Sequence, residues 1–180
     1  GVHSSTYAGG GGGRIAVYIH GEDAYTGLME AGGSESGDHD KSGGAGTIYR
    51  QLPGEEDSAG TIVVDNTYGS GPAGNLLRCK ETQLPMAVDG KPSKAYQKAT
   101  LVVQKRAKVR LMQSMRVKDL DMRDDSILDL GTNTLTILAK KHRDREGWSS
   151  LAKVVCTTNE ATGAYGKLVW RPSGFLISIH

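Results

Sequence analysis

Short alternating runs of apolar residues dominate the stretch from Ala99 to Leu138. Within each run every second residue is apolar, and this spacing places the apolar side chains of a β-strand on one face. Polar pairs or triplets separate the six runs, which are Leu101 and Val103, Val109 and Leu111, Met115 and Val117, Leu120 and Met122, Leu128 and Leu130, and Leu135 and Ile137. The pattern therefore predicts six short strands.

The connections between these runs favour one arrangement of the strands. A chain of hairpins should carry turn signals such as Asn-Gly or Asp-Gly between its strands, and neither dipeptide occurs in this stretch. Short strands joined by polar corners suit a solenoid in which three strands make one coil of roughly 20–24 residues. We therefore predict an all-β fold, a short parallel β-solenoid, with an antiparallel β-sandwich as the alternative.

Further strands are predicted on both sides of this stretch. Alternation predicts strands over residues 14–20, 46–52 and 60–66 before it, and three short strands, LAKVVCTT, KLVW and FLISIH, after it. We expect loops in the glycine-rich residues 1–13, the polar residues 34–46 and the charged residues 140–150. A short strand is expected near Leu76–Cys79, and the rest of the segment 75–98 is expected to be irregular.

Composition and charge both change near residue 74. Residues 1–74 hold 19 of the 25 glycines, and their three Lys or Arg against ten Asp or Glu give a formal charge of −7. Residues 75–180 hold 19 Lys or Arg against ten Asp or Glu, a formal charge of +9. We therefore distinguish an acidic glycine-rich region (1–74), an irregular connection (75–98) and a basic strand-rich region (99–180) within one continuous domain.

This asymmetry suggests partners for the protein. Opposite charges at the two ends of a chain let copies attract one another head to tail, so we expect self-association, with two solvated faces as the alternative. A row of cations alternates with apolar residues and would point outward from one face of a solenoid. That row would suit an acidic polysaccharide, or it would only discourage aggregation of strand edges. Its members are Lys105, Arg106, Lys108, Arg110, Arg116 and Lys118.

Nucleic acid is not the expected polyanion, because no aromatic residue is interleaved with these cations. The membrane interior is not expected either, since no apolar run of about 18 residues occurs. The chain does not begin with Met and carries no signal peptide, as we expect of a mature product or of a piece of a longer protein.

Two acidic groups are candidate calcium ligands, because Ca²⁺ prefers oxygen atoms on flexible loops. The first group includes Asp38 and Asp40, and the second includes Asp121 and Asp125. Neither follows the spacing of an EF-hand or of a calcium-binding nonapeptide repeat, so we expect solvated or corner side chains and no cofactor, with calcium as the alternative. In β-helix polysaccharide lyases such aspartates bind calcium beside a basic residue that removes a proton, and a lyase is therefore the enzymatic alternative.

The remaining motifs carry little chemistry. Gly69, Gly71 and Gly74 match the GxGxxG spacing of dinucleotide sites, but no helix is predicted after them, and we expect a loop. Cys79 and Cys156 would form a disulfide in an exported protein or remain two thiols. The five histidines are too scattered to suggest a catalytic arrangement.

Several segments resemble the glycine-rich exported or cell-surface β-helix proteins of environmental bacteria. The segments that carry the resemblance are GGGGGRIAVY from residue 9, GGAGTIYRQ from 43, GTIVVDN from 60, SILDLGTNTLTIL from 126 and GKLVWRPSGFLISI from 166. The resemblance covers most of the chain, although residues 75–98 match poorly. It implies a right-handed parallel β-helix or a related sandwich. It also implies secretion or display at the cell surface and a non-enzymatic structural or adhesive role.

Overall fold

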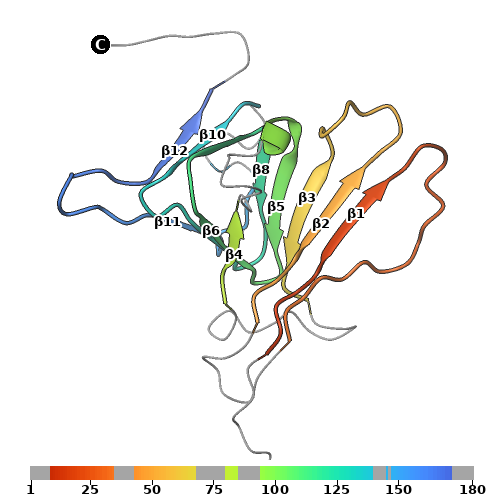
Figure 1. Ribbon diagram of the computed structural model, residues 1–180, viewed down its shortest axis with the longest axis horizontal. Helices are drawn as coiled ribbons and strands as arrows, with labels where there is room; N and C mark the ends of the chain where they lie inside the picture. Colours follow the sequence, from red (N-terminus) through yellow and green to blue (C-terminus); the bar gives the residue numbers. More distant parts are fainter. Residues whose placement is uncertain are drawn as a thin grey trace, which may run out of the picture.

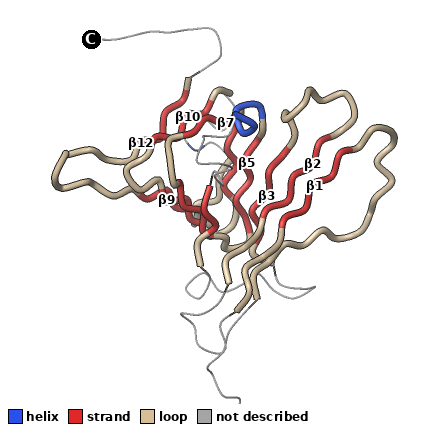
Figure 2. Tube along the Cα trace, viewed as in Figure 1, coloured by secondary structure: helices blue, strands red, loops and turns tan. Residues whose placement is uncertain are grey.

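The computed structural model describes residues 9–34, 43–67, 80–84, 94–139, 145 and 147–171, and nearly all of its regular secondary structure is short strands, which are joined by loops (Figure 2). One 3₁₀ helix, η2 (Lys94–Lys98), occurs among these residues. The strands are β1 (Arg14–Tyr18), β2 (Thr47–Gln51), β3 (Thr61–Asp65), β4 (Thr82–Leu84), β5 (Thr100–Gln104), β6 (Lys108–Leu111), β7 (Met115–Val117), β8 (Asp119–Met122), β9 (Ile127–Asp129), β10 (Thr134–Ile137), β11 (Lys153–Val155) and β12 (Lys167–Trp170).

The strands form three sheets. The first sheet has the order β1-β2-β3-β5-β8, the second has the order β4-β6-β9-β11, and the third has the order β7-β10-β12. Of the nine strand pairings within the described residues, only that of β2 with β3 is antiparallel. The prediction of an all-β fold is confirmed, and the mostly parallel pairing does not match the alternative of an antiparallel sandwich.

The chain passes between the sheets in a fixed order. Strands β5, β6 and β7 belong to the first, second and third sheets, and β8, β9 and β10 return to them in the same order. Register partners in these three pairs of strands are therefore separated by nearly the same length of chain. Examples are Thr100 with Asp119, Lys108 with Ile127 and Met115 with Leu135. Strands β11 and β12 extend the second and third sheets after longer connections (Figure 1).

The core lies between the three sheets and is made of aliphatic side chains. All twelve apolar residues of the six predicted runs between 99 and 138 are buried, each with at most 8% of its surface exposed. Alternation along the strands sends these residues inward and most of their neighbours outward, although Val102 of β5 and Asp119 of β8 are buried as well. The periodicity of the sequence therefore predicted both the strands and the buried side of this part of the molecule.

Two stacked corners connect the first sheet to the second. Lys105, Arg106 and Asp124 all adopt left-handed backbone conformations, with φ of 54°, 63° and 54°. Non-glycine residues rarely adopt these values, so each corner is held by other contacts. The carboxylate of Asp124 accepts a 2.8 Å hydrogen bond from the backbone N–H of Lys105, and the buried hydroxyl of Ser126 donates to the carbonyl oxygen of Val103.

The glycine-rich segments 9–13, 31–34 and 43–46 form a bundle of three extended chains below β1 and β2, which we call the glycine bundle. Each segment is hydrogen-bonded through its backbone to both of the others. The bonds run from Gly12 N to Gly44 O (2.8 Å), Ser34 N to Gly10 O (2.9 Å), Gly43 N to Ser34 O (3.0 Å), Gly46 N to Ala31 O (2.5 Å) and Thr47 N to Gly13 O (3.1 Å). These segments belong to no named strand, as expected of loops, but the sequence did not predict the bonds between them.

Absence of side chains permits this close approach. A Cβ atom on Gly12 would meet the carbonyl oxygen of Ala31, and one on Gly43 or Gly46 would meet the carbonyl oxygen of Gly10 or Gly13. Alternation of apolar residues cannot predict the packing of such a segment, because the atoms in contact belong to the backbone.

The connection between the acidic glycine-rich region and the basic strand-rich region contains a strand that was not predicted. Residues 82–84 form β4, although the segment 75–98 was expected to be irregular after residue 79. Thr82 and Leu84 point inward and Gln83 outward, and β4 pairs with β6 in parallel. Burial of Leu84 therefore stabilises a strand that shows no apolar alternation, because its other inward residue is Thr82. The strands predicted at 76–79 and 175–180, and the GxGxxG glycines, lie outside the described residues.

Candidate functional site

The six cations predicted to share one face are spread over two sheets and a corner. Lys105 and Arg106 occupy the corner after β5, while Lys108 and Arg110 lie on β6 in the second sheet. Arg116 lies on β7 in the third sheet, and Lys118 follows that strand. The chain turns between β6 and β7, so these residues do not form a single binding surface.

Carboxylates of neighbouring strands pair with several of these cations. Arg106 lies 3.1 Å from Asp125, and Arg110 lies 3.4 Å from Glu81 and 3.9 Å from Asp129. The basic run thus faces acidic residues of the strands and corners beside it. Because two of the four cations between 105 and 110 are paired within the protein, this part of the run is a poor candidate for binding a polyanion.

The second group of predicted calcium ligands also forms ion pairs with Arg side chains. Asp121 binds Arg123 at 2.7 Å, and Asp125 binds Arg106. Among the described residues, no cluster of His, Cys, Asp and Glu is arranged to hold a metal ion. Asp38 and Asp40 lie outside these residues, so calcium binding by the first acidic group stays a prediction.

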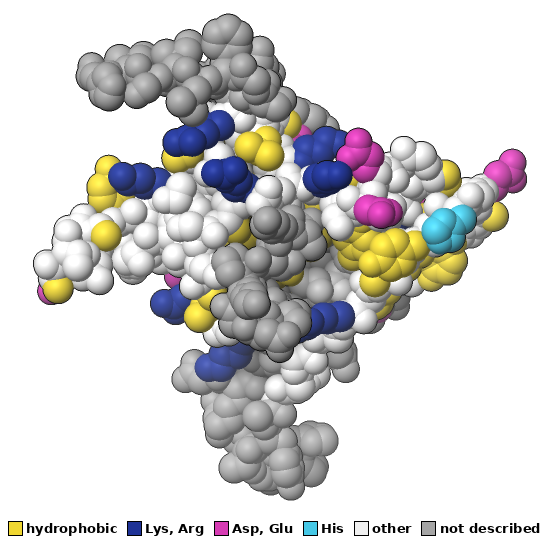
Figure 3. Space-filling view, turned by 45° about the horizontal axis from the view of Figure 1, so that its top comes forward, with side chains coloured by type: hydrophobic (Ala, Val, Ile, Leu, Met, Phe, Trp, Pro, Cys, Tyr) yellow, Lys and Arg dark blue, Asp and Glu magenta, His cyan; other side chains and the backbone are white. Residues whose placement is uncertain are grey.

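The outer face of the third sheet has a different composition, and we call it the cationic face. It is a grid of three rows across β7, β10 and β12. Thr134 is the register partner of Lys167, and Thr136 is that of Arg116 and of Val169. The other positions are those directly before β7 or directly after β7, β10 and β12. The rows are Ser114, Thr134 and Lys167; Arg116, Thr136 and Val169; and Lys118, Leu138 and Arg171. Four of the nine positions are Lys or Arg, and no Asp or Glu occurs at any of them. Figure 3 shows several Lys and Arg side chains gathered over the upper part of the molecule.

Sheet geometry fixes the spacing of these cations. Residues two apart along a strand are separated by about 6.6 Å and neighbouring strands by about 4.8 Å. Arg116, Lys118, Lys167 and Arg171 are all exposed, and the residues that alternate with them on β7 and β10 are buried in the core. The cations therefore stand on a rigid base and point away from the protein.

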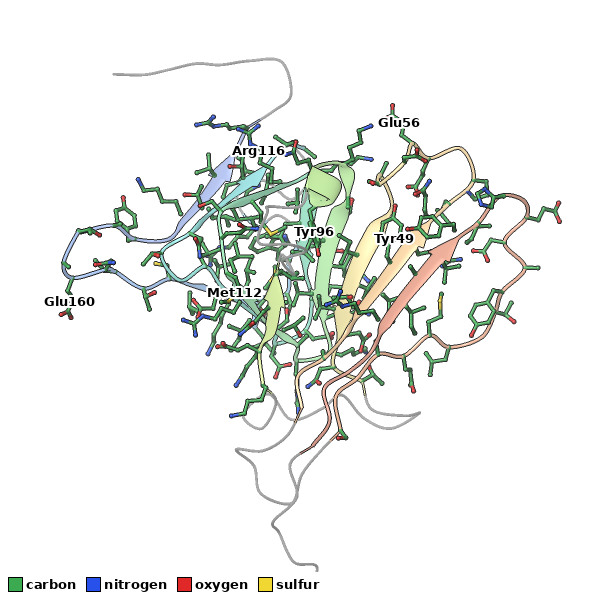
Figure 4. The ribbon with its side chains drawn as sticks, viewed as in Figure 1. Tyr49, Glu56, Tyr96, Met112, Arg116 and Glu160 are labelled. Carbon is green, nitrogen blue, oxygen red and sulfur yellow. The ribbon has the colours of Figure 1, made fainter. Side chains whose placement is uncertain are left out.

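One border of the cationic face carries an acidic neighbour. Glu56, in the turn between β2 and β3, accepts a 2.7 Å hydrogen bond from Lys98 of η2. This bond and the charge of Lys98 lower the pKa of Glu56, and Lys118 adds a smaller effect. The effect of Lys118 places its corner of the face nearest this carboxylate, and Figure 4 shows Glu56 on the side of β3 and Arg116 near β10 and β12.

Tyr165 borders the opposite side of the cationic face. Its side chain is 53% exposed, and the Nζ atom of Lys167 lies 4.9 Å from the centre of its ring. The backbone of Tyr165 forms an isolated antiparallel bridge with Thr158. An aromatic ring and a cation are thus held side by side at one corner of the grid.

Sequence reasoning missed Lys167, Arg171 and Tyr165. The alternation in KLVWR indicates that Lys167 and Arg171 share one side of a strand, but it does not say beside which strand they lie. A long connection that includes β11 separates Lys167 from its register partner Thr134, and the length of this connection cannot be predicted from periodicity.

Three further observations concern predictions about the chain as a whole. Cys156 is exposed and forms no disulfide with any described residue, while Cys79 lies outside the described residues, so a disulfide between the two stays a prediction. No helix within the described part of the chain has the length and apolar character needed to cross a membrane. Comparison of the chain with known protein families, curated proteins and solved structures finds no match.

Proposed function

We propose that this chain is a non-enzymatic adhesive module that binds acidic polysaccharide through the cationic face. The observation that carries the proposal is the grid itself, in which four exposed cations and three hydroxyl side chains occupy a flat sheet surface without a carboxylate. An extended acidic polymer can lie along such a surface and contact several cations at once, which raises its affinity by multivalency. Secretion or cell-surface display is part of the proposal and rests on the resemblance of the sequence segments.

The residues around the cations suit a sugar polymer. Ammonium and guanidinium groups bind carboxylate or sulfate groups, and Arg does so with two parallel hydrogen bonds. Ser114, Thr134 and Thr136 offer hydroxyl groups that can donate or accept hydrogen bonds with sugar hydroxyls. Attraction to the polymer should weaken as salt is added, because the cations are exposed and are screened.

A matched pair of double variants tests the proposal. Arg116→Gln with Lys167→Gln removes two cations from the cationic face, and Lys108→Gln with Lys153→Gln removes two from the outer face of the second sheet. Binding to polygalacturonate is measured for both by isothermal titration calorimetry. We expect the first variant to lose about tenfold or more in affinity, at about 1 kcal/mol per removed contact, and the control to lose less than about twofold.

Equal losses in the two variants would mean that net charge alone drives binding, and would overturn the assignment to this face. Absence of binding by the unmodified protein at low salt would overturn the proposed function. Circular dichroism spectra of the two variants exclude unfolding as the cause of a loss.

We also propose that the three sheets are the faces of a short right-handed parallel β-solenoid. Its support is the repeated passage of the chain through the three sheets, with register partners separated by nearly the same length of chain each time. Right-handedness is expected because about 98% of parallel crossover connections have that hand. A crystal structure with the opposite hand, or with sheets that do not enclose one core, would refute it.

A second candidate function is head-to-tail self-association, which the distribution of charge in space favours. Residues 9–34 and 43–67 hold two Arg and seven Asp or Glu, whereas residues 145 and 147–171 hold four Lys or Arg and one Glu. Figure 1 shows β1 and β2 on the opposite side of the molecule from β11 and β12. A contact between unlike ends generates filaments where the rotation between copies does not close into a ring.

Electron microscopy and sedimentation velocity at low and high salt test this second function. Filaments or large species at low salt that dissociate at high salt would support it. Monomers under both conditions would refute it and would leave polysaccharide binding as the sole proposal.

A further inference from the structure

Tyr165 and Lys167 lie on the same side of the chain, at the corner of the cationic face that is farthest from Glu56. Gly166, between them, is buried, and a Cβ atom on it would meet the Cβ of Cys156 at 2.8 Å. Because side chains alternate along an extended chain, the inward direction of Gly166 turns Tyr165 and Lys167 outward together. The ring of Tyr165 therefore adds an apolar surface to a face that is otherwise charged and polar.

The corner is pre-organised. The ammonium group of Lys167 lies 4.9 Å from the ring centre, a distance typical of a cation–π contact. The bridge between Thr158 and Tyr165 holds the backbone on one side, and pairing of Lys167 with Thr134 holds it on the other. A ligand that contacts both groups would therefore lose little binding free energy to the ordering of these two side chains.

We propose that Tyr165, Lys167 and Thr134 form a subsite for one uronic acid residue of the bound polymer. The carboxylate of the sugar binds the ammonium group of Lys167, and the C–H face of the pyranose ring packs against the ring of Tyr165. The hydroxyl of Thr134 lies in the same row as Lys167 and can bond a sugar hydroxyl. This inference rests on the proposed function and adds selectivity for sugars over other polyanions.

Selectivity follows from the two kinds of contact. Charge attracts any polyanion to Lys167, and inorganic polyphosphate would use this attraction alone. Only a ligand with an apolar ring face gains from Tyr165, since the electron-rich face of an aromatic ring attracts C–H groups. Charge and stacking can therefore be separated by comparing the two polymers.

The test measures binding of polygalacturonate and of inorganic polyphosphate to the unmodified protein, to Tyr165→Ala and to Tyr165→Phe. We expect Tyr165→Ala to weaken polygalacturonate binding about tenfold, as loss of an aromatic contact does, and to change polyphosphate binding less than about twofold. Tyr165→Phe keeps the ring and should bind both polymers like the unmodified protein.

Three results would overturn the inference. A loss of similar size for both polymers would mean that Tyr165 only positions Lys167, and no loss for either would mean that the ring is not part of the site. Binding of polyphosphate but not polygalacturonate by the unmodified protein would refute both the sugar subsite and the proposed binding of polysaccharide. If neither polymer binds, the proposed function fails together with its subsite.

Discussion

The guanidinium of Arg106 lies 3.1 Å from the carboxylate of Asp125, which is 19 residues further along the chain. This separation equals that between the register partners of β5 with β8 and of β6 with β9, so the pair connects two neighbouring corners. Arg110 and Asp129 repeat the relationship on the adjoining strands. The basic run from 105 to 110 and the acidic residues from 124 to 129 therefore stabilise each other instead of presenting two separate charged faces.

Removal of this pair should have a small effect on stability. Its side chains are 46% and 30% exposed, and exposed pairs contribute about 0.2–1 kcal/mol. A double-mutant cycle with Arg106→Gln and Asp125→Asn, measured by urea unfolding, should give a coupling energy in this range that decreases with added salt. A coupling that is absent at low salt would contradict the role of the pair as a link between corners.

Alanine substitutions test the close approach of the three segments in the glycine bundle. Gly12→Ala should destabilise the bundle by about 1–3 kcal/mol, because its Cβ meets the carbonyl oxygen of Ala31. Gly11→Ala is the matched control, since a Cβ there meets nothing within 4 Å and the substitution should be neutral or stabilise by up to about 1 kcal/mol.

Hydrogen exchange measures this difference locally. The amide of Thr47, bonded to the carbonyl oxygen of Gly13, should lose protection in Gly12→Ala and keep it in Gly11→Ala. Equal protection in the two variants would mean that the three segments do not approach as closely as the structure places them.

The contact between Glu56 and Lys98 should depend on pH. The hydrogen bond to Lys98 lowers the pKa of Glu56 below its ordinary value of 4.5, and the same bond raises the pKa of Lys98 above 10.5. A carboxyl with a lowered pKa contributes stability above the unfolded-state value and loses it as the pH falls through the folded value. An amine with a raised pKa contributes stability below the unfolded-state value and loses it as the pH rises through the folded value.

The attachment of the β2–β3 turn to η2 is therefore expected to be strongest between about pH 4.5 and 10.5. NMR titration of the Glu56 carboxyl in Lys98→Gln should show its pKa rising toward 4.5. A titration that is identical in the variant and in the unmodified protein would show that Lys98 is not the cause of the shift.

A core substitution tests the packing between the sheets. Leu128 is fully buried on β9, so Leu128→Ala should cost about 3–5 kcal/mol through lost burial and the cavity that remains. Leu151, which is 62% exposed, is the control, and Leu151→Ala should change the free energy of unfolding by less than about 0.5 kcal/mol. Similar effects in both variants would argue against a core at Leu128.

The sequence was most informative where alternation sets the buried side of a strand. A period of two identifies the side chains that point into the core, because a strand with one buried face places every second residue there. Leu101 and Val103 are one example, and Leu135 and Ile137 are another. Leu84 is equally buried, but the other inward residue of its strand is Thr82, so β4 shows no alternation of apolar residues. The glycine bundle gave no apolar signal, since it packs through its backbone.

Periodicity does not show which strands are neighbours or how their residues are paired. The run from Lys105 to Arg110 was interpreted as a cationic surface because nothing local indicates that Asp125 lies beside Arg106. The cationic face was missed for the same reason, as Lys167 and Arg116 come together only through β10. Residues on one strand can be assigned to a side from sequence, whereas a surface that spans several strands requires knowledge of which strands are neighbours.

The hydrogen bonds of the glycine bundle come from the backbone and from the hydroxyl of Ser34, and none comes from a titratable group. Protons and salt act on charged side chains, so acidification or high ionic strength would loosen Glu56 from Lys98 and screen the cationic face while leaving the bundle unaffected. The Glu56–Lys98 contact and the cationic face therefore depend on pH and salt, whereas the glycine bundle does not. In an environment of changing acidity and salinity, the bundle would keep β1 and β2 in place while attachment to a charged polymer came and went.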